Sequence, residues 1–308
     1  MSNFEVVADG LQFPEGPVAL SDGSVLVVEI RRGTLSRVTP GGDIEVVADC
    51  GGGPNGAAIG PDGRVYVCNN GGFEWMQVAG MWIPHGTPDT YTGGRIQVVD
   101  LDTGAVEDLY THCEGRSLRG PNDIVFDHHG GFYFTDMGKG TSAAVDLGII
   151  YYAKADGSSI VPVASGMHGP NGIGLSPDGT RLYVSETVSG FSWWWDVVQP
   201  GEVVGGKTFA GNGGGNFLYC WPEFAIYDSL GMEAGGNVCI ATMVKSGITV
   251  VSPDGKLVDF VENSDDPGTT NICFGGPDLT TAYVTSSSTG RLLRADWPRP
   301  GLALPYSA

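Results

Sequence analysis

Residues 170–179 read Pro-Asn-Gly-Ile-Gly-Leu-Ser-Pro-Asp-Gly, and residues 54–63 read Pro-Asn-Gly-Ala-Ala-Ile-Gly-Pro-Asp-Gly. Each copy has a polar residue after a proline, then a short run of small and apolar residues, then a Pro-Asp-Gly turn. A short run of this kind between turn signals is typical of a buried β-strand. Because self-similarity is the main sequence sign of a repeat architecture, these two stretches decide the fold class.

Four more copies extend the repeat along the chain. In every copy a polar residue stands seven positions before a turn, and these residues, called the ring residues below, are Glu15, Asn55, Asn122, Asn171, Asp228 and Asn271. The intervals between them are 40, 67, 49, 57 and 43 residues. Each interval holds several short strand-like segments separated by turn residues, and helical patterns are scarce. Units of this size predict the blades of a β-propeller, so we expect an all-β, six-bladed β-propeller.

A second internal match predicts how the ring of blades closes. Glu5–Asp9 reads EVVAD, as does Glu45–Asp49, and each copy stands ten residues before a ring residue. The chain therefore begins with an outermost strand that has no preceding inner strand, whereas the last unit ends after two further strands, at 281–287 and 290–297. Completing the last blade with the N-terminal strand removes an exposed sheet edge. We expect one domain, residues 1–308, closed in this way.

The composition limits the partners of the protein. The chain has 16 basic and 35 acidic residues, a net charge of −19. Such a surface repels phosphate backbones and anionic lipids, so we expect neither nucleic acid nor a membrane as a partner. The six cysteines lack metal-binding spacings and residues 1–13 do not resemble a signal peptide, which predicts reduced thiols and a cytoplasmic protein. The expected partner is a small molecule, bound by a monomer or a small homo-oligomer.

The ring residues suggest a cation site. Equivalent positions of the innermost strands of a propeller surround its axis, and we place the ring residues in the loops that lead into these strands. All six side chains carry a carbonyl or carboxylate oxygen, and none is basic. Two carboxylates with several amide oxygens suit a hard divalent cation, most simply Ca²⁺. Asn-Gly turns would explain Asn55 and Asn171 equally well, but they do not explain an oxygen ligand in all six copies.

Two insertions are expected to shape a substrate site above the ring residues. One spans residues 69–94 and the other residues 187–216, and insertions in propellers tend to emerge on one face. In the first, Trp82 and His85 are candidate substrate contacts, and His168, close before a ring residue, is another. For both histidines the alternative is an ordinary loop side chain.

Several motifs carry a resemblance to a known family. They are Phe13-Pro14-Glu15-Gly16-Pro17, Gly120-Pro121-Asn122-Asp123, Gly169-Pro170-Asn171-Gly172-Ile173 and Ser176-Pro177-Asp178-Gly179. With them the chain resembles the SMP-30/gluconolactonase/LRE-like family over nearly its whole length. The resemblance implies a six-bladed propeller that hydrolyses lactones with a bound divalent metal, often calcium.

The resemblance also implies a role for individual residues. Glu15, Asn171 and Asp228 match the metal ligands of the family, and Asp228 also matches its proposed general base. Asn122 matches a residue that lies beside the metal and contacts substrate or completes the metal's coordination. By the same geometry we expect the two remaining ring residues, Asn55 and Asn271, to contact substrate.

Two departures from the family pattern bear on these assignments. The fifth-blade motif is usually Pro-Asp-Gly but reads Tyr227-Asp228-Ser229 here, so Asp228 is assigned mainly from its place in the repeat. Some members have an Arg that binds sugar-lactone hydroxyls two residues before the third-blade Asn. In this chain that position is Gly120, and Arg119 lies one residue further back.

The sequence thus predicts an enzyme, a metal-dependent lactonase that hydrolyses a small γ- or δ-lactone to the hydroxy acid. Ca²⁺ is the expected cofactor, with Zn²⁺, Mn²⁺, Mg²⁺ and Fe²⁺ as other candidates. Two alternatives stay open. One is a calcium-dependent phosphoryl hydrolase of the organophosphate type, and the other is a non-catalytic, ligand-binding propeller with a structural calcium.

Overall fold

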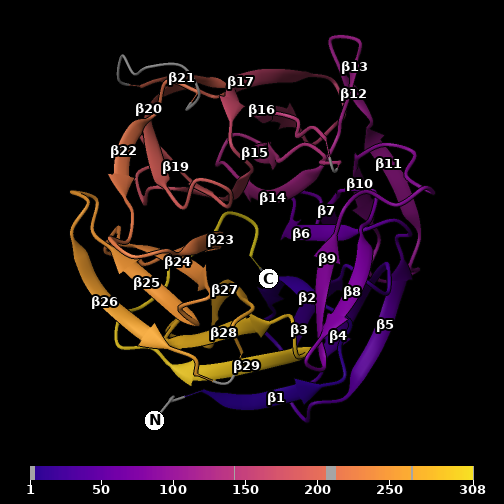
Figure 1. Cartoon of the computed structure of the whole chain (residues 1–308), viewed down its shortest axis with the longest axis vertical. Helices are drawn as coiled ribbons and strands as arrows, with labels where there is room; N and C mark the ends of the chain where they lie inside the picture. The colour runs from indigo at the N-terminus through magenta and orange to yellow at the C-terminus, as the bar shows by residue number, and fades with distance from the viewer. Residues whose placement is uncertain (1–3, 142, 206–212, 265, 308) are drawn as a thin grey trace.

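The computed structural model describes residues 4–141, 143–205, 213–264 and 266–307, and it shows antiparallel sheets arranged radially about an axis (Figure 1). The first three blades have four strands each. From the axis outward these strands are β2 (Pro14–Ala19), β3 (Val25–Glu29), β4 (Thr34–Val38) and β5 (Ile44–Asp49); β6 (Pro54–Ile59), β7 (Val65–Asn69), β10 (Arg95–Val99) and β11 (Val106–Tyr110); and β14 (Pro121–Phe126), β15 (Gly131–Asp136), β16 (Gly148–Lys154) and β17 (Ile160–Met167).

Three further blades complete the predicted six-bladed propeller, which is confirmed. Their strands are β18 (Pro170–Leu175), β19 (Arg181–Glu186), β20 (Ser192–Gln199) and β21 (Glu202–Val204), with β22 (Asn216–Tyr219) also paired to β20; β23 (Ile226–Met232), β24 (Val238–Met243), β25 (Gly247–Val251) and β26 (Leu257–Glu262); and β27 (Thr269–Gly275), β28 (Thr281–Ser286), β29 (Arg291–Asp296) and β1 (Glu5–Asp9). The N-terminal strand β1 pairs with β29, so the ring closes as predicted. Ion pairs of 3.1 Å between Glu5 and Arg294 and between Asp9 and Arg291 flank this closure.

Two short hairpins lie outside the blades. β8 (Glu74–Val78) pairs with β9 (Met81–His85) within residues 69–94, and β12 (His112–Cys113) pairs with β13 (Arg116–Ser117). Strands account for the regular structure of the described residues. No helix in that part of the chain is long and apolar enough to cross a membrane.

The predicted insertion at 187–216 is wrong in its extent. Residues 192–199 form β20, the third strand of the fourth blade, because Trp193 and Trp195 alternate inward and are 9% and 1% exposed. The additional segment therefore begins only after this strand and includes β21 and β22. Residues 206–212 of the predicted insertion lie outside the described residues.

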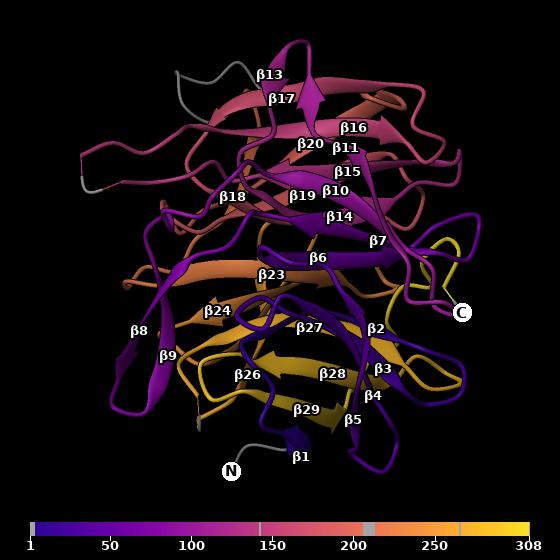
Figure 2. The same ribbon diagram turned by 90° about the vertical axis from the view of Figure 1, so that its right-hand side faces the viewer.

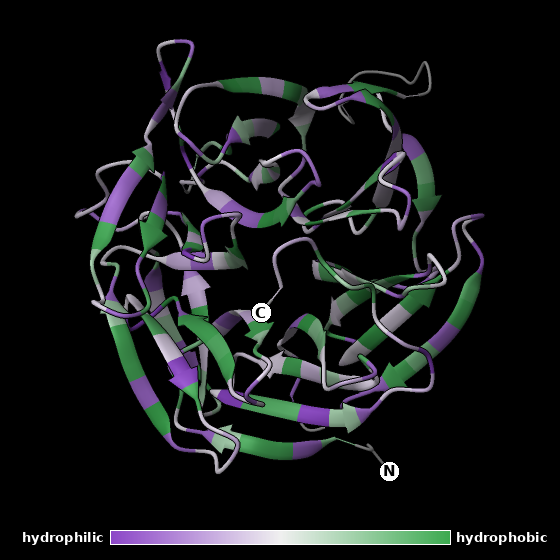
Figure 3. Ribbon diagram, turned by 180° about the vertical axis from the view of Figure 1, so that it is seen from behind, coloured by the Kyte–Doolittle hydropathy of each residue, from purple (hydrophilic) through white to green (hydrophobic). Residues whose placement is uncertain are grey.

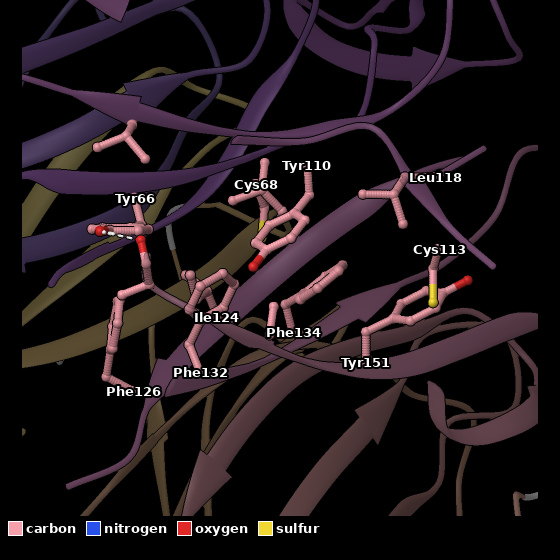
Figure 4. Close-up of a cluster of buried hydrophobic side chains, with 14 of the residues drawn as sticks. Tyr66, Cys68, Tyr110, Cys113, Leu118, Ile124, Phe126, Phe132, Phe134 and Tyr151 are labelled. Carbon is pink, nitrogen blue, oxygen red and sulfur yellow. Dashed lines mark hydrogen bonds between the residues drawn. The ribbon is translucent and has the colours of Figure 1, made fainter. Parts of the chain in front are cut away.

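The core lies between neighbouring blades. Second strands such as β3 and β7 are buried along their whole length, because both of their faces are covered, whereas the outer strand β5 is largely exposed. Figure 4 shows the layer between the second and third blades, where Tyr66 of β7 packs against Phe126 and Phe132. Phe134 stacks on Tyr151 in the same layer, with ring centroids 5.2 Å apart. This packing holds adjacent inner strands in fixed positions about the axis.

Different segments cover the two ends of the axis. The C-terminal residues 301–307 lie at one end (Figure 3). Residues of this segment and of the inner strands line a cavity of about 130 Å³. Leu302 anchors this segment by donating its N–H to the carbonyl of Met232 at 2.8 Å. The β8–β9 hairpin lies at the other end, as Figure 2 shows with the hairpin at the left and the C-terminus at the right.

Candidate metal centre

A β-bulge marks the ring residue of every inner strand. In β2 the three steps from Glu15 to Val18 face only two steps on β3, from Val28 to Leu26, so that one residue is left over. The same excess of one residue occurs in β6, β14, β18, β23 and β27. A bulge bends its strand and re-aims a side chain. The ring residues therefore lie at bulges inside the strands, and their predicted place in the preceding loops is wrong.

The inner strands bring the ring residues together around the axis. Five of them are buried: Glu15, Asn55, Asn122, Asn171 and Asn271 are 2%, 6%, 3%, 3% and 5% exposed. Asp228 lies deep in the molecule but keeps part of its surface accessible, as expected for a side chain that lines the channel.

Hydrogen bonds to two ring residues cross blade boundaries. Asn271 Nδ2 donates to Glu15 Oε2 at 2.9 Å, which links the last blade to the first. Ser229 Oγ, beside Asp228, donates to Asn171 Oδ1 at 3.3 Å, which links the fifth blade to the fourth. One amide hydrogen of Asn271 is thus used to orient Glu15, and its predicted contact with substrate stays a prediction.

The carboxylates of Glu15 and Asp228 have no basic partner among the described residues. Burial raises the pKa of Glu15, and burial together with the charge of Glu15 raises the pKa of Asp228 well above its usual range. Among the described residues, no Lys, Arg or His forms an ion pair with either carboxylate. Two carboxylates that repel each other in a low-dielectric interior favour a cation between them.

Asp123 is a further carboxylate at the axis that was not predicted as a site residue. It is 7% exposed, it lines the channel cavity, and burial with the charge of Glu15 raises its pKa to about 7. Its Oδ1 accepts the N–H of Ile124 at 2.9 Å. The sequence does distinguish this residue, because Asp123 is the only acidic residue that directly follows a ring residue.

The side chain of Asn122 shows that the donor set fits a metal ion. Asn122 Nδ2 donates to Met137 Sδ at 3.3 Å, whereas its Oδ1 is buried and accepts no hydrogen bond. Buried acceptors are rarely left unpaired, and a cation at the axis would satisfy this oxygen. Among the described residues, no three His, Cys, Asp or Glu side chains are grouped as metal ligands. A cation here would depend on amide oxygens as well as carboxylates, which suits a hard ion such as Ca²⁺.

Glycines allow neighbouring blades to approach closely at the axis. A Cβ on Gly172 would lie 2.4 Å from the nitrogen of Leu230 and 2.7 Å from the Cα of Ser229. These are main-chain atoms of the adjacent blade, so they cannot rotate away from a clash. The Asn-Gly pair at 171–172 thus meets a packing requirement as well as presenting a polar side chain.

Replacing Gly172 by Ala is therefore expected to separate the fourth and fifth blades beside Asp228. We expect a loss of about 1–3 kcal/mol in the free energy of unfolding and weaker Ca²⁺ binding. Thermal unfolding and calcium titration calorimetry measure the two effects. Gly235→Ala is the matched control, because a Cβ there meets nothing within 4 Å. Equal effects of the two substitutions would contradict the packing argument.

Residues 69–94, called the lid below, leave the second blade and contact the chain beside the first inner strand. Trp75 of β8 packs on Phe13, with ring centroids 5.0 Å apart. Phe13 has a φ of 57°, a left-handed conformation that is uncommon for a bulky residue, and it stands two residues before Glu15. Backbone strain of this kind persists where the surroundings impose it, often at functional sites. The contact couples the lid to the strand that carries Glu15.

Further contacts hold the lid to three other segments of the propeller. The guanidinium of Arg31 lies 3.6 Å from the ring centroid of Trp82, and the main-chain N–H of Trp82 donates to the carbonyl of Ser288 at 3.1 Å. Thr87 Oγ1 donates to the carbonyl of Gly140 at 2.9 Å. The lid therefore leaves the second blade and touches the first, third and sixth blades. Figure 1 shows its β8–β9 hairpin crossing in front of β3 and β4.

The predicted roles of His85 and His168 stay predictions. Both residues are exposed, His85 at the end of β9 and His168 just before β18. The main-chain N–H of His168 donates to Glu186 Oε1 at 2.7 Å. Arg119, one residue before Gly120, pairs through its Nε with Asp146 at 2.9 Å.

Curated proteins similar to the chain include two lactonases. Gluconolactonase of Zymomonas mobilis subsp. mobilis is 26% identical over 311 residues, which covers 94% of this chain and 80% of that protein. Lactonase drp35 of Staphylococcus saprophyticus is 32% identical over 256 residues, which covers 82% of this chain and 70% of that protein.

Solved structures share the fold. Regucalcin of Agrobacterium tumefaciens, a calcium-binding protein, aligns with a TM-score of 0.73 at 17% identity, covering 98% of this chain and 96% of that one. A gluconolactonase of Xanthomonas campestris aligns with a TM-score of 0.73 at 19% identity, covering 97% and 89%. At these identities the likeness shows the fold alone.

The family assignment comes from the sequence. The model of the SMP-30/Gluconolactonase/LRE-like region matches residues 13–288, a span that includes all six ring residues, from Glu15 to Asn271. The residues that would hold a cation thus lie within the matched region, on the inner strands of the predicted fold. The chain therefore belongs to the SMP-30/gluconolactonase/LRE-like family.

Proposed function

We propose that this protein is a metal-dependent lactonase that opens a small γ- or δ-lactone to the hydroxy acid. One observation carries the proposal, namely that the carboxylates of Glu15, Asp228 and Asp123 interact electrostatically at the axis, where no basic side chain among the described residues pairs with them. The relatives named gluconolactonase and lactonase drp35 support the reaction type. A lactone is a cyclic ester. Water opens it by adding to the carbonyl carbon, after which the bond from that carbon to the ring oxygen breaks.

The ring residues would hold the cation, which we propose is Ca²⁺. Glu15, Asn171 and Asp228 would be its ligands, with the unpaired Oδ1 of Asn122 completing the set. The bound ion supplies a Lewis acid that polarises the lactone carbonyl and stabilises the developing oxyanion. The calcium-binding regucalcin of the same fold supports the choice of metal.

The chain itself supplies proton transfer and positioning. We assign Asp228 as the group whose carboxylate oxygen takes a proton from the attacking water and returns it to the ring oxygen as the ester bond breaks. Asp228 is the ring carboxylate that keeps part of its surface accessible, so a water molecule can approach it. Asn271 holds Glu15. Asn55 would contact the substrate.

The lid is proposed to cover the bound lactone. Trp75 and Trp82 are only partly buried, so each keeps apolar surface that is not used by Phe13 or Arg31. An apolar cover excludes water from the reacting ester and favours a lactone with few hydroxyl groups. This preference agrees with the absence of the family's sugar-binding arginine at Gly120.

Proton release from a panel of γ- and δ-lactones tests the proposal. Purified protein is assayed in weak buffer before and after chelation, and again after Ca²⁺, Zn²⁺, Mn²⁺, Mg²⁺ or Fe²⁺ is added singly. We expect hydrolysis that disappears on chelation and returns best with Ca²⁺. A fluorophosphate in the same panel tests the phosphoryl-hydrolase alternative. Loss of thermal stability on chelation, with no substrate turned over under any condition, would indicate a structural cation and overturn the proposal.

A further inference from the structure

A buried lysine beneath the lid forms no ion pair with an acidic side chain of the described residues. Lys139, three residues after the end of β15, is 7% exposed. Its Nζ donates to the carbonyl of Gly72 at 2.7 Å and approaches Asn70 Oδ1 at 3.4 Å. Among the described residues, no carboxylate lies within 4.0 Å of this ammonium group. Lysines are almost never fully buried unless they are paired, so this one calls for an explanation.

The nearby acidic side chains are used elsewhere. Both oxygens of Asp136 accept main-chain N–H groups, from Arg119 and Gly120 at 2.7 Å and from Gly138 at 3.0 Å. Asp146 pairs with Arg119. Neither carboxylate forms an ion pair with Lys139 Nζ. Burial lowers the pKa of Lys139 to about 7, although the charge of Asp136 opposes this shift. The cost of burying its charge is thus only partly offset within the described chain.

Asn70 leaves a second donor unpaired beside Lys139. The residue is fully buried, and its Oδ1 accepts the N–H of Gly72 at 2.8 Å. Its Nδ2 is buried and has no hydrogen-bond partner. Lys139 and Asn70 thus present a cation and an N–H group, and a ligand that satisfies both must be an acceptor. A carboxylate is the simplest group that accepts two hydrogen bonds and also neutralises the charge.

The pair lies on the same face as the ring residues and close to them. Asn70 donates its main-chain N–H to the carbonyl of Gly53, two residues before Asn55, at 2.8 Å. Lys139 lies two residues after Met137, and the sulfur of Met137 accepts a hydrogen bond from Asn122. Two residues span at most about 7 Å of extended chain. The pair therefore lies beside the sector of the axis that Asn55 and Asn122 occupy.

Aromatic side chains of the lid cover the ammonium group. Phe73 and Tyr91 place their ring centroids 4.1 Å and 5.3 Å from Lys139 Nζ. The β8–β9 hairpin, which follows Phe73, pairs with no blade. The ammonium group therefore lies under side chains of the lid rather than open to solvent.

We propose that Lys139 Nζ and Asn70 Nδ2 form a subsite that binds a carboxylate substituent of the lactone. The proposal rests on the lactonase function and narrows its substrate class to lactones with a carboxylate near the reacting ester. Lys139 then acts as a specificity-determining residue. It places the substrate through a group that does not react, while the ring residues act on the ester.

The test compares two substrates that differ only in this group, γ-butyrolactone and its γ-carboxylate derivative. In the calcium-loaded protein, Lys139→Met is expected to lower kcat/KM for the carboxylate by about 30-fold, the usual effect of losing a charged hydrogen bond. The value for γ-butyrolactone is expected to change by less than about threefold. Lys245→Met is the matched control, because it removes the same charge and a similar aromatic contact, with Trp221 at 4.3 Å. An equal loss for both substrates would overturn the proposal.

A second variant separates ligand binding from folding. Asn70→Asp keeps the acceptor for Gly72 and gives Lys139 a carboxylate partner within the chain. We expect it to fold with an unchanged or higher melting temperature and to lose the preference for the carboxylate lactone. If the preference persists in this variant, the subsite is wrong.

Calorimetric titration with the product diacid distinguishes a failure of the subsite from a failure of the lactonase function. The subsite predicts binding to the wild-type protein that is at least about tenfold tighter than to Lys139→Met, whether or not any lactone is hydrolysed. Tighter binding of the diacid by the wild-type protein, without hydrolysis of any lactone, would support the subsite and reject the lactonase function. Lactone turnover with equal diacid affinity in both proteins would reject the subsite alone.

Discussion

Replacing Asp228 by Asn is expected to lower kcat/KM for lactone hydrolysis by about 10³-fold, the usual scale of a lost general base. The amide keeps the size of the side chain and one oxygen ligand, but it cannot take a proton from water. Because Asp228 is proposed both to hold the cation and to act as the base, the loss should fall mainly on kcat. Initial rates of proton release over a range of lactone concentrations measure the effect.

Two further variants show which role of Asp228 matters. Glu15→Gln removes a ligand charge but leaves the proposed base, so we expect weaker calcium binding and activity that is recovered at high calcium concentration. Asp254→Asn changes an exposed turn carboxylate and controls for the loss of one negative charge. If Asp228→Asn were rescued by calcium as fully as Glu15→Gln, Asp228 would be only a ligand, and the assignment of the base would be wrong.

Metal-free protein is expected to lose stability as the pH rises from about 4 to about 7. Asp123 has an ordinary pKa of 3.8 when unfolded and about 7 in the fold, so folding favours its protonated form. The stabilisation is fully present below the unfolded value and disappears as pH rises through the folded value. A shift of about three units corresponds to about 4 kcal/mol, or about 10 °C in melting temperature. The raised pKa values of Glu15 and Asp228 act in the same direction.

Calcium should reverse this dependence, because a bound cation stabilises the ionised carboxylates. Melting temperatures of chelated and calcium-loaded protein, measured across the pH range, test the expectation. Asp123→Asn is the matched variant, since its amide oxygen can still accept the N–H of Ile124. We expect a flatter profile for this variant without metal. A metal-free wild-type protein that is equally stable at pH 4 and pH 7 would contradict the buried-carboxylate cluster.

The sequence predicted the ring residues but not all of their surroundings. The repeated spacing was sufficient for Asn55 and Asn171, because inner strands of similar blades place equivalent positions at the same height along the axis. It did not predict Asp123, whose bulge brings a second consecutive side chain to the axis. Nor did it single out Lys139, since a lone lysine after a strand is ordinarily solvated.

The site beneath the lid depends on contacts that are distant in sequence. Trp82 meets the main chain of Ser288, and Asn70 approaches Lys139 from a different blade. No local pattern encodes such pairs, because they arise only when the ring of blades is closed and the lid crosses its face. The same holds for the missing partner of Asn122 Oδ1, which is evident only from the atoms around it.

The sequence by itself determined the number of blades, the closure by Glu5–Asp9 and the identity of the ring residues. These features follow from the sequence repeat. Each blade needs the same order of strands, turns and buried positions, so similar residues recur along the chain. The tertiary structure decided the register of the bulges, the position of the lid and the burial of Lys139 without an ion pair. Those features depend on how surfaces of different blades pack against one another, and packing is a property of the assembled fold rather than of any one segment.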